Sequence, residues 1–388
     1  MESFISRRTA IAQMAAGSAV ACQSATAIGR APQSAGQPVA PPVPSQQEGI
    51  FHLYTSRVRP LVMMSAGDSL PIPVMFDTGS NGNMVDTAVA LELGLVRKPN
   101  HQSFITDASG TTIEAYAAHV PDMRVGALPV ARNLVDVYDY RVDDEVGILG
   151  PNLFRDSAIY LNFPKNVVYV RDAPSSRRNV PNAIGYSGAN GDGLPMIDIS
   201  VEGLSAGLLG VIDTGKSDEL SFPESMIDKL PLTAPPTVVG TATTVFTSVP
   251  VLGAKIDGAV RIGTVTLMSP DVIFHGDMPK VGLPVLEKQR IWLEPHNQRA
   301  WVARPTLLDR ATAETFQCQF GERRIWLDQD TLIYQRQGRP RFRLEYLGAD
   351  HFQFVGDDTE VILRRTDDGT ISGFTLLGAS GDPYEVSA

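Results

Sequence analysis

Short apolar runs separated by turn residues fill most of the chain from about residue 49 onward. The first of them predict strands at Phe51–Ser56, Leu61–Met64 and Ile72–Phe76, because short runs rich in β-branched and aromatic residues between turn residues are typical of strands. A helix is predicted near Val85–Leu93, with Gly94 as its C-terminal stop. The pattern therefore predicts a mostly β chain with few helices.

One of these runs occurs twice. Val74–Phe76 leads into the turn Asp77-Thr78-Gly79-Ser80, and Val211–Ile212 leads into Asp213-Thr214-Gly215-Lys216. A strand holds the carboxylate at its end in place, and the following Gly lets backbone N–H groups approach that carboxylate. Paired carboxylates that share one proton are a known means of activating water. The repeat therefore predicts a site built from two aspartates.

The similarity between the two halves extends beyond these turns. Gly150–Val170 aligns without a gap with Gly282–Val302, so that Tyr160 corresponds to Trp292. Self-similarity of this kind predicts a duplicated β-rich unit of about 120 residues.

The order of these features resembles a known family. A strand, an Asp-Thr-Gly-Ser turn, a short helix ending in Leu93-Gly94-Leu95 and then Gly147–Gly150 resemble one unit of the retropepsin-like aspartic proteases. Two such units in one chain resemble the bilobed arrangement of pepsin-type enzymes, over about residues 50–305. The resemblance implies a mostly β, bilobed double β-barrel in which the two Asp loops meet at a pseudo-twofold axis, under a β-hairpin flap.

We divide the chain into six segments on this basis. They are an export signal (1–27), a Pro-rich linker (28–48), a first lobe (49–172), an interlobe connection (173–193), a second lobe (194–305) and a C-terminal antiparallel β module (306–388). The module contains short alternating strands such as Arg341–Leu344 and His351–Phe354. It resembles a module attached to bacterial serine hydrolases, and it could present substrate, bind cell-envelope components or cover a lobe, which is the interpretation we favour.

The resemblance implies that Asp77 and Asp213 hydrolyse peptide bonds through an activated water, without a covalent intermediate and without a cofactor. Two carboxylates a few ångströms apart do not both ionise readily, so one keeps a proton. The ionised member would deprotonate the water, and the protonated member would polarise the peptide carbonyl. The expected partner is a polypeptide substrate, and the expected state is a monomer that acts as a pseudo-dimer.

The same resemblance implies supporting roles for the neighbours of the two aspartates. Thr78 and Thr214 would form hydrogen bonds across the lobe junction, and Gly79 and Gly215 would supply N–H donors. The small hydroxyl of Ser80 would lie against the carboxylate.

A flap is expected in the first lobe. Phe104–Tyr116 predicts a hairpin whose tip contains Asp107, Ser109 and Gly110. Its position matches the flap of the family, and a surface hairpin without a gating role is the alternative.

Two lysines depart from the family pattern. Lys216 follows the second Asp-Thr-Gly, and Lys280 stands where an apolar residue is expected before Val281-Gly282. A buried ammonium beside the dyad would favour its ionised form, whereas a long side chain could instead reach outward. These lysines motivate an alternative interpretation, a catalytically impaired bilobed protein that binds peptides or envelope components. A third interpretation is a homodimer in which Asp77 pairs with its symmetry mate.

Charge and composition exclude several other functions. The formal net charge of −10 argues against nucleic acid as a partner. The six histidines are scattered with no pair at ligand spacing, so no metal site is predicted. No uninterrupted apolar stretch is long enough to predict a membrane-spanning helix.

The N-terminal residues resemble an export signal. Ser6–Ile11 precedes an Ala/Gly-rich run, as in twin-arginine signals, and Ala25–Ala27 offers a small-residue cleavage site. This predicts a bacterial protein that is periplasmic or associated with the cell envelope. Ala19–Cys22 is also a loose match to a lipoprotein site, in which Cys22 would carry a lipid anchor. The other cysteine, Cys318, is expected to be a strand residue and not a nucleophile.

Overall fold

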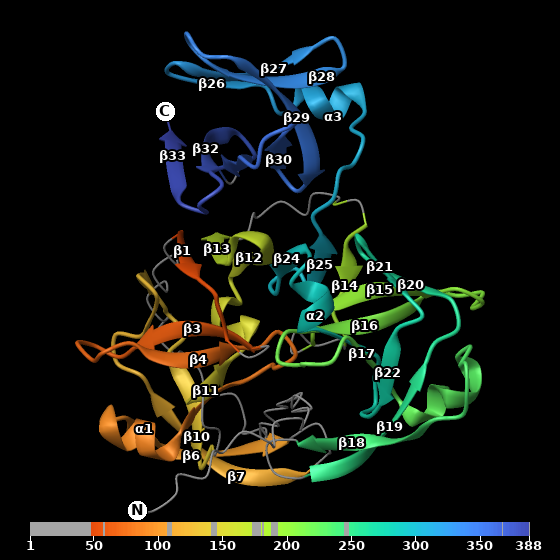
Figure 1. Ribbon diagram of the computed structural model, residues 1–388. Helices are drawn as coiled ribbons and strands as arrows, with labels where there is room; N and C mark the ends of the chain where they lie inside the picture. Colours follow the sequence, from red (N-terminus) through yellow and green to blue (C-terminus); the bar gives the residue numbers. More distant parts are fainter. Residues whose placement is uncertain are drawn as a thin grey trace, which may run out of the picture.

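The computed structural model describes residues 48–56, 59–106, 111–140, 146–172, 180, 182–187, 193–243, 248–366 and 368–387. The predicted export signal, Cys22, nearly all of the linker and most of 173–193 lie outside the described residues. Strands dominate the rest and form four sheets, which confirms the mostly β fold class (Figure 1). None of the helices in the described residues combines the length and the apolar character needed to cross a membrane.

The first lobe is built on a ten-stranded sheet. Its strands are β2 (Tyr54–Ser56), β3 (Arg59–Ser65), β4 (Ile72–Phe76), β5 (Asn83–Asp86), β6 (Val96–Thr106), β7 (Thr112–His119), β8 (Arg124–Val125), β9 (Leu128–Pro129), β10 (Leu134–Tyr138) and β11 (Gly147–Leu149). The strand order is β6-β7-β10-β5-β11-β4-β3-β8-β9, with β2 paired to β3. The predicted strands Leu61–Met64 and Ile72–Phe76 are present, whereas the predicted strand Phe51–Ser56 is divided at Leu53 into β2 and a strand of another sheet. The predicted helix is α1 (Thr87–Glu92), and Asp86 caps it by accepting a hydrogen bond from the Ala88 N–H.

The second lobe contains a nine-stranded sheet. Its strands are β15 (Met196–Val201), β16 (Leu208–Asp213), β17 (Leu220–Phe222), β18 (Thr237–Thr243), β19 (Ser248–Lys255), β20 (Ala259–Ile262), β21 (Val265–Met268), β22 (Asp271–Phe274) and β23 (Lys280–Gly282). Two short helices accompany them, η3 (Glu224–Lys229) and α2 (Leu283–Leu286).

The two sheets have the same strand order. The second runs β18-β19-β22-β17-β23-β16-β15-β20-β21, which matches the first strand for strand once β2 is set aside. The parallel pairs also correspond, since β4 is parallel to β11 and β16 is parallel to β23. Each Asp-Thr-Gly therefore follows a strand in the same position of its sheet.

A third, six-stranded sheet joins the lobes. Its strands are β1 (Gly49–His52), β12 (Ser157–Asn162), β13 (Val167–Asp172), β14 (Ile184–Gly185), β24 (Arg290–Glu294) and β25 (Arg299–Val302). They are ordered β1-β13-β12-β24-β25-β14, so the first lobe supplies one half, and the second lobe together with β14 of the interlobe connection supplies the other. Short helices η1 (Pro151–Phe154) and η2 (Phe163–Lys165) flank β12.

The centre of this sheet carries the local symmetry. Tyr160 of β12 faces Trp292 of β24 in an antiparallel pair, and their rings stack with centroids 4.8 Å apart. These are the two residues that the sequence repeat aligns. Equivalent residues face each other in an antiparallel pair where a twofold axis passes between them, so the axis relating the lobes runs through this pair.

The C-terminal residues form an eight-stranded antiparallel meander in which each strand pairs with the next. After α3 (Arg310–Glu314) its strands are β26 (Cys318–Phe320), β27 (Arg323–Asp328), β28 (Thr331–Arg336), β29 (Arg341–Gly348), β30 (His351–Phe354), β31 (Glu360–Arg365), β32 (Ile371–Leu377) and β33 (Pro383–Ser387). The meander encloses its own core, which includes Phe352 and Phe374. Cys318 is a strand residue, and burial raises the pKa of its thiol to about 11, which keeps it in the unreactive form.

The meander packs on the six-stranded sheet (Figure 1). An apolar cluster spans this interface and contains residues from both sides, which are Ala158, Tyr160, Tyr169, Trp292, Trp301, Leu347, Ala349, Ile362 and Leu377. The meander therefore covers the junction of the two lobes, and not one lobe alone as the sequence led us to expect.

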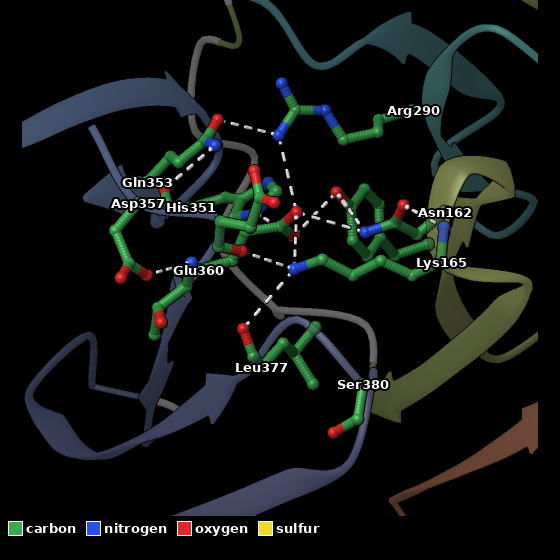
Figure 2. Close-up of polar contacts among 12 residues, drawn as sticks. Asn162, Lys165, Arg290, His351, Gln353, Asp357, Glu360, Leu377 and Ser380 are labelled. Atoms are coloured by element: carbon green, nitrogen blue, oxygen red, sulfur yellow. Dashed lines mark hydrogen bonds and ion pairs between the residues drawn. The ribbon is translucent and has the colours of Figure 1, made fainter. Parts of the chain in front are cut away.

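A buried carboxylate reinforces the same interface (Figure 2). Glu360 of β31 accepts hydrogen bonds from Tyr160 at 2.8 Å and from Asn162 at 3.0 Å. It also forms ion pairs with Lys165 at 3.2 Å and Arg290 at 3.3 Å. Burial by itself raises the pKa of Glu360, but the hydrogen bond from His351, the charge of Lys165 and the hydrogen bond from Tyr160 hold it well below its ordinary value.

His351 completes this network as a neutral imidazole. The indole N–H of Trp292 donates to its Nδ1 at 3.2 Å, and its Nε2 lies 3.0 Å from Glu360. Since an indole can only donate, Nδ1 accepts and Nε2 carries the proton that it shares with Glu360. Burial also lowers the pKa of His351, in agreement with the neutral form.

We expect Glu360→Gln to lower the free energy of unfolding of the docked module by about 3–5 kcal/mol, because it leaves the ammonium of Lys165 buried without its counter-charge. The matched control is Glu322→Gln, which removes an exposed pair with Arg336 and should cost no more than about 1 kcal/mol. Denaturant unfolding followed by tryptophan fluorescence reports on Trp292 and Trp301 at the interface. Equal effects of the two substitutions would contradict the structural role of Glu360.

Candidate active site

The two aspartates stand at equivalent strand ends. Asp77 follows β4 and Asp213 ends β16, and both side chains are fully buried. The N–H of Asp77 donates to the Leu149 carbonyl of β11 at 2.9 Å, which fixes the backbone where the strand gives way to the turn. The sheet therefore sets the direction in which each carboxylate leaves its strand.

The threonines bond the two turns to each other across the lobe junction, the arrangement that the family resemblance implied. The Thr78 hydroxyl donates to the Ile212 carbonyl at 2.6 Å, and the Thr214 hydroxyl donates to the Phe76 carbonyl at 2.6 Å. Each hydroxyl oxygen also accepts from the N–H of the opposite threonine, at 2.9 and 3.1 Å. These four buried hydrogen bonds are reciprocal, so the position of each turn depends on the other.

The glycines bring the two carboxylates face to face. A Cβ built on Gly79 would lie 2.5 Å from the carboxyl carbon of Asp213, and one built on Gly215 would lie 2.6 Å from that of Asp77. Real Cβ atoms essentially never come this close to another heavy atom, so a larger residue at either position would displace the facing carboxylate. Each carboxylate thus packs against the glycine of the turn that carries the other carboxylate.

Of the two carboxylates, Asp77 is the one that accepts hydrogen bonds from backbone N–H groups. Its Oδ1 accepts from the N–H of Gly79 at 2.8 Å and from the N–H of Gly215 at 3.2 Å. Within the described part of the chain, no hydrogen bond reaches the Asp77 Oδ2, either oxygen of Asp213 or the Lys280 ammonium. Buried polar atoms are rarely left in this state except at sites that bind polar ligands or water.

The charge state of the pair follows from this environment. Burial raises the pKa of Asp77 well above its ordinary value, and the nearby charge of Asp213 raises it further, against smaller opposing effects that include the N–H of Gly79. One proton therefore stays on the pair over a wide range of pH.

Lys280 is the cation next to the pair. Its Nζ lies 3.3 Å from Asp213 Oδ2, and its side chain is only 6% exposed. The sequence marked Lys280 as an unusual residue in its strand but did not predict its contact with Asp213. The parallel pairing of Val211 with Lys280 was the missing information, because it places Lys280 on the same face as Asp213.

Lys216 does not play the part that its sequence position indicated. It is buried, but its Nζ donates to Asp218 at 2.9 Å, so it neither pairs with the dyad nor reaches outward to solvent. Burial lowers the pKa of Lys216, and the charge of Asp218 opposes that shift. The sequence left open whether Lys216 lies buried beside the dyad or reaches outward. In the structure it is buried and close enough to Asp213 for that charge to act on its pKa, but its ammonium pairs with Asp218, two residues along the turn.

Ser80 is buried next to the Asp-Thr-Gly turn. Its hydroxyl donates to the Gly82 carbonyl at 3.0 Å and accepts from the Gly82 N–H at 3.2 Å, which closes the turn after the aspartate. The predicted hairpin is present as β6 and β7, but its tip residues Asp107, Ser109 and Gly110, the flap candidates, lie outside the described residues. Across the described chain, no three His, Cys, Asp or Glu side chains gather closely enough to hold a metal ion.

The geometry agrees with the comparison of the sequence to known families. Residues 62–153 match the aspartyl protease family model. The matched aspartyl protease segment runs from β3 to η1 and includes the first Asp-Thr-Gly, whereas Asp213 lies beyond it. No curated protein matches the chain. Over these residues the first lobe is thus similar to an aspartyl protease domain.

The interlock predicts a large effect of Thr78→Val. This substitution leaves the Ile212 carbonyl and the Thr214 N–H without their buried partner, and each should cost about 1–3 kcal/mol of unfolding free energy. Thr78→Ser keeps the hydroxyl and should cost only about 1 kcal/mol for the lost methyl group. Chemical denaturation of both variants measures the difference. A valine variant as stable as the serine variant would show that the interlock does not hold the turns.

Proposed function

We propose that the chain is an aspartic endopeptidase that hydrolyses peptide bonds with Asp77, Asp213 and an activated water. The observation that carries this proposal is the reciprocal threonine interlock, which brings two buried carboxylates to one place. The aspartyl protease match over 62–153 supports the same class of reaction.

In the proposed reaction the ionised carboxylate takes a proton from the water as the water oxygen attacks the peptide carbonyl carbon. The protonated carboxyl gives its proton to the carbonyl oxygen, so that a neutral tetrahedral intermediate forms. When the intermediate collapses, the proton that came from the water moves to the amide nitrogen and the C–N bond breaks. The other carboxylate regains a proton from a hydroxyl of the intermediate. The pair ends as it began, with one proton between two carboxylates.

The setting of this activity is part of the proposal. The twin-arginine-like residues at the N-terminus support an exported protein, periplasmic or attached to the cell envelope, with Cys22 as an alternative lipid anchor. Both Asp turns belong to one polypeptide and bond to each other within it, which supports an active monomer over a homodimer.

A second candidate function is a bilobed protein that binds peptides without cleaving them. The ion pair of Lys280 with Asp213 favours it, because a fixed positive charge eases the loss of the proton that catalysis requires.

Activity assays of single variants separate these functions. We expect the purified protein to cleave an unfolded protein substrate, and we expect Asp77→Asn and Asp213→Asn each to lower kcat/KM by about 100-fold or more. Asp198→Asn, at an exposed aspartate of β15, is the matched control and should keep full activity. Peptide binding without turnover between pH 3 and 8 would instead identify the binding protein, and an active Asp213→Asn variant would point to a homodimer of first lobes.

A further inference from the structure

The second lobe carries a lysine where the first lobe carries an isoleucine. In the first lobe Ile148 of β11 pairs with Met75 of β4, and in the second lobe Lys280 of β23 pairs with Val211 of β16. Met75 and Val211 each precede their aspartate by two residues. Ile148 and Lys280 are therefore equivalent positions, and only the second lobe has a charge there.

The strand geometry directs the lysine to the aspartate. Neighbouring side chains in paired strands point to the same face of the sheet, and residues two apart along a strand share that face. Lys280 thus extends along the face of β16 from its partner Val211 toward Asp213, where its Nζ comes within 3.3 Å of Oδ2. The first lobe has an apolar cluster on the corresponding face, which includes Met75 and Ile148.

A buried ammonium is costly unless a counter-charge is near. Lys280 is 5% exposed, and in the described part of the chain the ion pair with Asp213 is the only one assigned to it. An apolar residue at this position, as in the first lobe, would avoid that cost. The lysine is therefore difficult to explain by packing alone, and its contact is with the proposed site.

We propose that Lys280 is a positioning residue that holds the negative charge of the dyad on Asp213 and leaves the shared proton on Asp77. This inference rests on the proposed function and refines it by giving the two aspartates different roles. Asp213 then accepts the proton of the water, and Asp77 donates to the carbonyl oxygen of the substrate. The Oδ2 of Asp77, which accepts no hydrogen bond within the described residues, is the oxygen left to carry that proton.

The other charged groups around the pair agree with this assignment. Asp77 and Lys280 face Asp213 from β4 and β23, and Lys216 faces it from the turn after β16. The ammonium of Lys216 is bonded to Asp218, so its charge is largely balanced. The charge of Lys280 also acts on Asp77, where it opposes the rise in pKa, but the direct ion pair of Lys280 is with Asp213.

The lysine should also move the working pH of the enzyme. A positive charge beside a carboxylate favours the ionised form and so lowers the pH at which protons leave the pair. Lys280→Met removes the charge and keeps a long apolar side chain, so both limbs of the kcat/KM profile should move to higher pH, by about 1–3 pH units. Lys216→Met is the matched control, a second buried lysine in the same lobe, and should move the profile much less because Asp218 already balances its charge.

A second measurement does not depend on activity. Carboxyl ¹³C titration of Asp-labelled protein, assigned with Asp77→Asn and Asp213→Asn, should show Asp213 ionising at lower pH than Asp77 in the unmodified chain. In Lys280→Met the separation should shrink. Lys280→Ile, which copies the first lobe, offers the same test if the methionine variant does not fold.

The outcomes separate the two proposals. A chain that cleaves peptides but shows the same pH profile and the same carboxyl titration with and without the Lys280 charge overturns the role of Lys280 and leaves the peptidase standing. A chain that cleaves nothing overturns the peptidase, while the carboxyl titration still decides whether Lys280 polarises the pair. A wild-type titration in which Asp77 ionises first overturns the assignment of roles directly.

Discussion

The reciprocal hydrogen bonds of Thr78 and Thr214 are the constraint on which the rest of the site depends. Each hydroxyl spans from its own turn to a carbonyl of the other lobe and receives an N–H in return. Because all of these groups are buried, separating the lobes would break four hydrogen bonds and leave two hydroxyls, two carbonyls and two N–H groups without their partners. The carboxylates of Asp77 and Asp213 are brought together as a consequence of this arrangement and not through any attraction of their own.

The lobes are joined a second time by the six-stranded sheet. Tyr160 and Trp292 meet on the axis that relates the lobes, and the meander covers them through Glu360 and His351. The C-terminal module is therefore bonded to the sheet that joins both lobes. A buried network of this kind is rigid, because each of its polar groups has a hydrogen-bond partner within the network.

The local pattern of the chain was sufficient for much of this structure. The repeat of Asp77-Thr78-Gly79 and Asp213-Thr214-Gly215 predicted paired carboxylates, because the strand, the acid and the glycine lie within a few residues of each other. The β3, β4 and α1 elements followed from apolar spacing and from Gly94. The aligned pair of Tyr160 and Trp292 was visible in the sequence, but its meeting across the lobe junction depends on a strand pairing more than a hundred residues apart.

The sequence could not place the long side chains of two lysines. It left open whether Lys216 lies buried beside the dyad or reaches outward, and in the structure it is buried with its ammonium bound by Asp218. Lys280 is far from Asp213 in sequence and reaches it only through the parallel pairing of β16 and β23. A one-residue difference in that pairing would turn Lys280 to the opposite face, which is why sequence alone could not place it.

The central claim is that the two aspartates form one site, and a bound transition-state mimic tests it most directly. A crystal structure with a peptide analogue that carries a tetrahedral hydroxyl carbon in place of the scissile carbonyl would locate that hydroxyl. We predict that the hydroxyl lies within hydrogen-bond distance of both Asp77 and Asp213, about 2.5–3.0 Å from an oxygen of each. A hydroxyl bound to only one of them, or an analogue bound elsewhere on the chain, would contradict the account.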